Sequence, residues 1–209
     1  YDDVIPLSKK ERANWKALKF NSIAALKRIG IGKDGDIGEA GFSAMEREWG
    51  RPTAEINGIW GGYTGKGAKT VIPAHASAKV SFRLVADQDP KKITKLFFQW
   101  LKANTPGGCR WELNDHHGGF GVTVPIDSPH LEFASRAIKK ATGKSPALIK
   151  SGGSIPVAGM LKDVLKLDTI FMGFGLDDDR VHSPNEKFEL DCFRWGARSH
   201  AAFIGELLS

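Results

Sequence analysis

A strict two-residue alternation over residues 76–84 is the feature that most constrains the fold of this chain. In an extended segment successive side chains point to opposite faces. The apolar face would carry Ala76, Ala78, Val80, Phe82 and Leu84, and the polar face would carry Ser77, Lys79, Ser81 and Arg83. One apolar and one polar face are typical of an antiparallel strand that lies with one side on a core. Helices must therefore cover the apolar side.

The neighbouring segments fit such a layer. Residues 54–60 also alternate, and a glycine-rich loop separates them from the strand predicted at 75–85. Asp89-Pro90 begins a helix with an apolar stripe, and a further strand is expected at 110–115. This β–β–α–β order predicts an α+β layer, an antiparallel sheet with helices on one side.

Three helices are predicted before the sheet. Ser8 and Glu11 have the spacing of a capping box, so a helix should run to about Leu18. A second helix begins near Ser22, and a short third one covers 43–49.

The second half alternates between helix and strand, which favours an α/β layer. The expected order is a helix from Ser128-Pro129 to Gly143, a strand at 147–150, a helix at 155–166, an apolar strand at 169–173 and a helix at 191–208. We place a domain boundary near Gly118-Gly119, which divides the chain into residues 1–118 and 119–209.

Composition excludes several function classes. The net charge of +6 comes from dispersed lysines and arginines, so we expect solvated faces rather than a nucleic-acid track. No apolar run approaches the roughly 20 residues that span a bilayer, so no membrane contact is expected. Cys109 and Cys192 cannot form a disulfide framework and indicate reduced thiols in a cytoplasmic protein.

Two segments carry candidate chemistry. Gly152-Gly153-Ser154 leads into a helix, and its N–H groups could meet an anion or a developing oxyanion, although a plain N-cap fits equally well. His182 follows the apolar strand and an acidic run, where a neutral imidazole could bind a metal; a surface-loop histidine is the simpler alternative.

Three further residues are weaker candidates by spacing alone. His117 ends a strand at the predicted domain junction, a common place for a cleft, or is a solvent-exposed strand end. Arg83 could bind a substrate carboxylate with both arms of its guanidinium group, and Thr70 could add a hydroxyl; either could be an ordinary exposed residue.

Six short blocks occur in order along the chain: Gly58-Ile59 with Gly61-Gly62, residues 69–73, residues 81–85, residues 117–119, residues 152–156 and residues 182–186. Together they resemble the zinc-dependent exopeptidase and amidohydrolase family, on its cytosolic nonspecific dipeptidase and carnosinase branch. The resemblance implies a catalytic α/β domain with two divalent metal ions, zinc first and manganese as the alternative. It also implies an inserted α+β lid, with a ferredoxin-like antiparallel sheet, that makes a homodimer.

Carried over by motif, the resemblance makes residues 1–118 most of the lid and 119–209 the C-terminal part of the catalytic domain. It assigns roles to six residues: His182 as a metal ligand, Arg83 as the clamp on the C-terminal carboxylate of a small peptide substrate, His117 as the histidine that stabilises the oxyanion, Gly153 and Ser154 as the substrate-binding turn, and Thr70 as a contact across the dimer.

The family's remaining metal ligands and its general base have no counterpart here, since the chain has no His-x-Asp motif and no Glu-Glu pair. We therefore expect the C-terminal portion of a longer dipeptidase, inactive alone. Two alternatives stay open: an amidohydrolase that removes an acyl group from N-acyl amino acids, and a non-catalytic dimerisation module.

Overall fold

The computed structural model describes residues 2–116, 118–152 and 155–208. The chain forms two compact units. The first comprises Tyr1–Val122 and Lys150–Ser154, and the second comprises Thr123–Ile149 and Ile155–Ser209. In the described part of the chain, every helix is too short or too polar to cross a bilayer.

The first unit begins with short capped helices. They are α1 (Lys9–Ala17), α2 (Ser22–Arg28), the 3-10 turn η1 (Lys33–Gly35) and α3 (Ala44–Gly50). The predicted capping box is confirmed, because Ser8 Oγ accepts the Glu11 N–H and the Glu11 carboxylate accepts the Ser8 N–H. Trp15 of α1 is buried, and its ring meets that of Trp49 edge to face at 5.3 Å. This contact joins α1 to α3.

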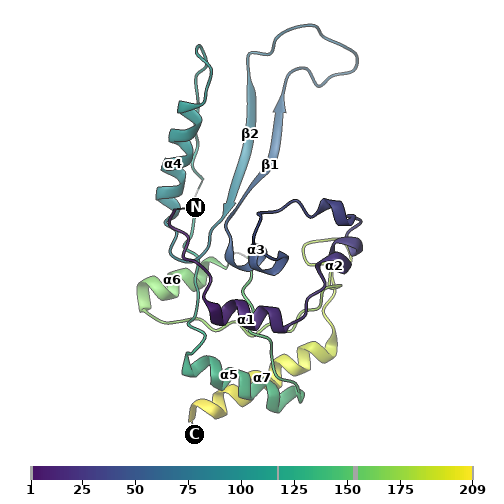
Figure 1. Ribbon diagram of the computed structural model, residues 1–209, viewed down its shortest axis with the longest axis vertical. Helices are drawn as coiled ribbons and strands as arrows, with labels where there is room; N and C mark the ends of the chain where they lie inside the picture. The colour runs from purple at the N-terminus through teal and green to yellow at the C-terminus, as the bar shows by residue number, and fades with distance from the viewer. Residues whose placement is uncertain (1, 117, 153–154, 209) are drawn as a thin grey trace. The chain divides into compact units, whose positions relative to one another are not determined.

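An antiparallel hairpin follows, formed by β1 (Thr53–Gly61) and β2 (Ala76–Arg83) (Figure 1). The register pairs Thr53 with Arg83 and Glu55 with Ser81, so these side chains share the polar face that the alternation predicts. A bulge between Ile56 and Gly58 shifts the register by one residue.

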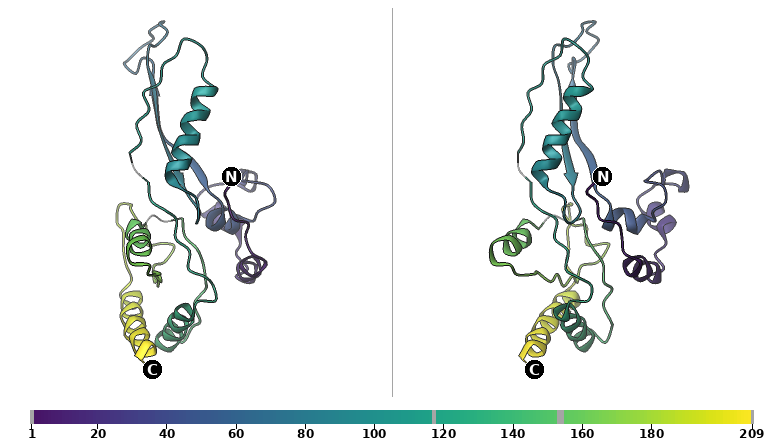
Figure 2. Two further views of the ribbon diagram at one scale, coloured as in Figure 1. Left: turned by 90° about the vertical axis from the view of Figure 1, so that its left-hand side faces the viewer. Right: turned by 60° about the vertical axis from the view of Figure 1, so that its left-hand side comes forward.

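Helix α4 (Pro90–Ala103) lies along this hairpin in both views of Figure 2. Asp89 caps it by accepting the Lys91 N–H, and Pro90 occupies the first turn as predicted. Phe82 of β2 meets Phe97 of α4 edge to face at 5.1 Å. Such a pair stabilises packing by about 0.5–1.5 kcal/mol beyond its area. An antiparallel sheet with a helix on its apolar face is therefore confirmed, and the polar face is left for other uses.

The second unit is built on helices α5 (Pro129–Thr142), α6 (Pro156–Leu165) and α7 (Leu190–Leu208). Gly143 ends α5 in the left-handed conformation, with φ at 74°, which glycine adopts without steric cost. Helices α5 and α7 pack together (Figure 2), and their buried residues are small: Ala134, Ala137, Cys192 and Ser199. Arg136 of α5 pairs with Glu206 of α7 at 2.8 Å.

Three predicted strands are wrong. Residues 110–115, 147–150 and 169–173 form no regular strand in the structure. A strand exists only where its backbone hydrogen-bonds to a neighbour. Within the described residues these three segments have no such ladder, so the expected helix–strand alternation appears as helices joined by irregular chain.

Candidate functional site

Arg83 ends β2 on the polar face of the hairpin, among three other polar side chains. Glu55 lies diagonally opposite, with Oε1 3.9 Å from Nε of Arg83. Thr53 donates its hydroxyl to Oε1 of Glu55, and Ser81 donates to Oε2 at 3.4 Å. Register pairing places all four side chains on one face, because cross-strand partners point the same way. The face therefore presents one guanidinium group beside one oriented carboxylate.

The same guanidinium group contacts a segment 69 residues away in the sequence. Nη1 of Arg83 donates a hydrogen bond to the carbonyl oxygen of Gly152. Gly152 opens the glycine turn predicted to bind substrate, so the structure brings together the predicted clamp and the start of this turn. The other predicted residues here, His117, Gly153 and Ser154, lie outside the described residues.

Thr70 is exposed in the loop that joins β1 to β2. Arg83 stands at the other end of β2, and an eight-residue strand spans about 24 Å. The structure thus does not bring Thr70 to Arg83 within one chain. A shared site would need Thr70 from a second copy, which remains a prediction.

His182 lies in the second unit, on an exposed loop closed by a buried carboxylate. Asp179 is 1% exposed; its carboxylate accepts the Leu176 N–H at 2.7 Å and the Lys187 ammonium at 2.9 Å. These two donors hold the pKa of Asp179 below its usual range, the Leu176 N–H first. Lys187 also donates its backbone N–H to the Asp179 carbonyl at 3.0 Å. Residues 176–187 therefore form a loop pinned at both ends.

Within this pinned loop His182 adopts a positive φ of 63°, and its N–H meets Oε2 of Glu186 at 3.3 Å. A non-glycine residue in this region needs support from its surroundings. His182 was predicted from the sequence, but the role of Lys187 was not. The available signal was spacing, because a lysine eight residues after an acidic run can pair with it and close the loop between them.

Metal binding needs several ligands in one place. Among residues 2–116, 118–152 and 155–208, no group of three or more histidine, cysteine or acidic side chains could hold a metal ion. His182 is thus one candidate ligand, and the described residues alone do not fit a dinuclear centre. Cys109 and Cys192 are free thiols, the first exposed and the second buried.

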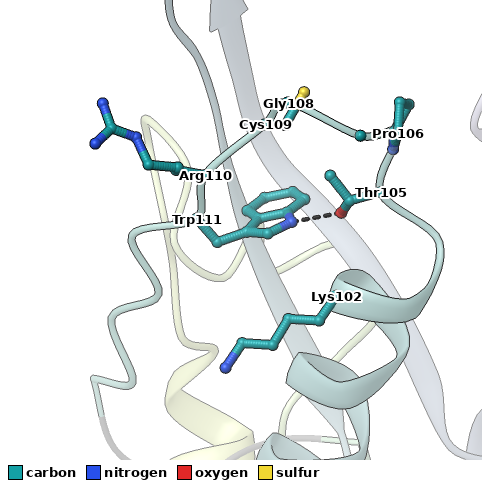
Figure 3. A pocket seen from close by; sticks show the side chains of 8 residues that line it. Lys102, Thr105, Pro106, Gly108, Cys109, Arg110 and Trp111 are labelled. Atoms are coloured by element: carbon teal, nitrogen blue, oxygen red, sulfur yellow. Dashed lines mark hydrogen bonds between the residues drawn. The ribbon is translucent and has the colours of Figure 1, made fainter.

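An open cavity of about 540 Å³ lies beyond the C-terminal end of α4 (Figure 3). The indole of Trp111 points across it and donates a hydrogen bond to the Thr105 hydroxyl. Its remaining lining is Lys102 and residues 106–110. The sequence signal for this region was the Pro106-Gly107-Gly108 turn, and Arg83, Thr70 and His182 do not line the cavity.

Comparison with known proteins gives one family model that matches this chain, a peptidase dimerisation domain over residues 9–109. The Cys-Gly metallodipeptidase of Saccharomyces cerevisiae is 33% identical over 206 residues, which cover 96% of this chain and 42% of that protein. The human Beta-Ala-His dipeptidase is 26% identical over 215 residues, covering 99% of this chain and 41% of that protein. The chain thus spans about two fifths of the length of the curated relatives it matches.

Solved structures agree. An M20 family metallo-carboxypeptidase from Sulfolobus solfataricus has a TM-score of 0.79 at 29% identity, covering 98% of this chain and 46% of that one. A di-peptidase from Saccharomyces cerevisiae has a TM-score of 0.73 at 31% identity, covering 98% and 43%. Residues 9–109 therefore match a peptidase dimerisation domain, and over nearly its whole length the chain is similar to M20 metallopeptidases.

Proposed function

We propose that this chain serves in a metal-dependent enzyme that hydrolyses dipeptides or short peptides with a free C-terminus. The observation that carries the proposal is the contact between Arg83 and Gly152, which joins the predicted carboxylate clamp to the predicted substrate turn. Relatives named for Cys-Gly and Beta-Ala-His dipeptides support this substrate class.

Arg83 suits a terminal carboxylate because one edge of its guanidinium group is left for ligand. Nη1 is engaged by Gly152, while Nε and Nη2 hydrogen-bond to no described residue. Another arginine of this chain shows how such an edge binds a carboxylate. Nε and Nη2 of Arg51 donate hydrogen bonds to the two carboxylate oxygens of Glu39, at 2.8 and 2.7 Å. A peptide carboxylate on Arg83 would take the same two-armed geometry. Such a clamp requires a free C-terminus, which is the signature of exopeptidase action.

The remaining roles are proposed by family likeness. His117 would stabilise the charge that develops on the scissile carbonyl oxygen, Gly153 and Ser154 would line the substrate, and Thr70 would reach a second copy across a homodimer. His182 would be a ligand of one of two divalent ions, zinc first and manganese as the alternative. The other ligands and the general base would come from residues outside this chain, so residues 1–118 would be lid and 119–209 part of the catalytic domain.

Two further proposals concern the chain as a whole. On its own it would be inactive, because one ligand cannot hold a tight dinuclear site. It would act in the cytoplasm, a proposal supported by the two free thiols.

Hydrolysis assays with matched substrates test the proposal. The metal-loaded enzyme should cleave glycylglycine much faster than glycylglycinamide, which lacks the terminal carboxylate, and faster than N-acetylglycine. Preference for N-acetylglycine would move the function to the amidohydrolase alternative. Absence of cleavage of all three, with a dimer and no bound zinc in a native mass spectrum, would favour a non-catalytic module, the reading that the matched dimerisation domain supports.

A further inference from the structure

The face that carries Arg83 also carries a carboxylate where a substrate carboxylate would compete. Oε1 of Glu55 is 3.9 Å from Nε of Arg83, an ion-pair distance too long for a hydrogen bond. Both side chains are open to solvent, with 53% of Arg83 and 40% of Glu55 exposed. Glu55 therefore lies beside Nε of the guanidinium group without hydrogen-bonding to it.

Two hydroxyls explain why Glu55 stops short of Arg83. Thr53 donates to one carboxylate oxygen, and Ser81 makes a longer contact of 3.4 Å to the other, so each oxygen has a hydroxyl partner on the strand pair. Arg51 shows the contrasting case, since the Glu39 carboxylate closes fully on its Nε and Nη2. The hydroxyls of Thr53 and Ser81 thus hold a negative charge beside the clamp and keep it from closing the clamp.

We propose that Glu55 sets the affinity of Arg83 for the substrate carboxylate, as a resident anion held back by Thr53 and Ser81. This inference rests on the proposed function of Arg83. A carboxylate that docks on the Nε–Nη2 edge meets the Glu55 charge at close range, and like charges at such range oppose binding. Glu55 therefore weakens the clamp and speeds the loss of a product that carries the same carboxylate.

Two substitutions on this face should act in opposite directions. Glu55→Gln removes the resident charge and keeps the shape, so carboxylate binding should tighten by roughly two- to fivefold, the range for exposed ion pairs. Thr53→Val removes one restraining hydroxyl at equal volume, so Glu55 can close on Arg83 and binding should weaken. Glu112→Gln is the matched control, since it makes the same charge change at an exposed carboxylate outside the hairpin.

The test follows the Arg83 side-chain N–H signal by nuclear magnetic resonance while the chain is titrated with glycylglycine, and separately with glycylglycinamide. Arg83→Lys assigns the signal. The expected result is a dissociation constant for glycylglycine that falls in Glu55→Gln, rises in Thr53→Val and is unchanged in Glu112→Gln. If the dissociation constant for glycylglycine is unchanged or higher in Glu55→Gln while the Arg83 signal still shifts, the inference about Glu55 is wrong, but the proposed carboxylate-binding role of Arg83 stands. If the Arg83 signal does not shift with glycylglycine, or shifts equally with glycylglycinamide, Arg83 does not bind the terminal carboxylate. Both the proposed role of Arg83 and the inference about Glu55 are then wrong.

Discussion

Lys187 and Arg83 are two cations of this chain with opposite surroundings. Lys187 is enclosed by carboxylates, with Nζ 2.9 Å from Asp179, 3.0 Å from Glu189 and 3.2 Å from Asp178. These partners raise its pKa, the hydrogen bond to Asp179 first. Arg83 has one carbonyl partner and a carboxylate at 3.9 Å that does not reach it.

The difference separates a structural charge from a binding charge. Three carboxylates within nine residues of Lys187 match the three N–H donors of its ammonium group, and the side chain of one of them, Asp179, is only 2% exposed. Arg83 is half exposed and keeps a two-donor edge open. A cation whose donors are all taken within the fold stabilises a loop. A cation with donors left over can bind an anion from solution. Four measurements test this contrast.

The largest expected effect is on catalysis. In the complete, metal-loaded enzyme of which this chain is proposed to be part, Arg83→Met should lower kcat/KM for glycylglycine by roughly one to two orders of magnitude, because charged hydrogen bonds contribute about 1.5–3 kcal/mol each. The thermal midpoint of unfolding should stay the same, since the side chain is exposed. Arg110→Met, at another exposed arginine, is the kinetic control. Equal losses in both variants would remove the distinction of Arg83.

The second effect is on thermal stability, and it concerns the ion pair between Lys187 and Asp179. Asp179→Asn should lower the thermal midpoint of the second unit, because it removes a buried charge that pairs with Lys187 and accepts the Leu176 N–H. Asp178→Asn removes a carboxylate on the same lysine, but one that is 74% exposed, and should change the midpoint much less. Calorimetry of both variants decides whether burial or mere pairing sets the contribution.

The third effect depends on pH. The folded pKa of Asp179 lies below its unfolded value of about 3.9, so its stabilisation is complete above that value and is lost as pH falls through the folded pKa. The gap in thermal midpoint between the natural chain and Asp179→Asn should be full near pH 6 and close in acid, below about pH 4. A gap that does not narrow at all as pH falls below about 4 would contradict this assignment.

The smallest effect is expected on the free energy of unfolding when the solvent-exposed carboxylate of Glu55 is removed. Glu55→Gln should change the free energy of unfolding by less than about 0.5 kcal/mol in urea titrations, because an exposed pair contributes little. The same variant should tighten carboxylate binding. A large loss of stability would mean that Glu55 is structural, like Asp179.

Local sequence signals predicted much of the fold. Ser8 with Glu11, and Asp89 with Pro90, marked helix starts because a cap needs only neighbouring residues. The alternation through Phe82 and Arg83 gave both faces of β2 correctly. Residues 110–115, 147–150 and 169–173 failed, because a strand depends on a distant partner that composition does not reveal. The bulge at Asn57 was equally invisible, and it moves Trp60 onto the face of Lys79, whose ammonium lies 5.9 Å from the ring.

The candidate site was predictable only in part, for the same reason. Arg83, Thr70 and His182 could be named from motifs, since each lies in a short recognisable block. Their surroundings could not, because Gly152 is 69 residues from Arg83 and Glu55 meets it through strand register. Lys187 went unnoticed because its role depends on the burial of Asp179, a property of the folded loop.

The contact between Arg83 and Gly152 also fixes an order of events during synthesis. The first unit is not continuous in sequence. Residues 123–149 belong to the second unit, and they are synthesised between the two segments of the first unit. Chains emerge from the ribosome N-terminus first, at roughly 5–20 residues per second. The hairpin therefore exists for several seconds with the Arg83 guanidinium group still in water, and the clamp gains its carbonyl partner only when the first helix of the second unit has already left the ribosome.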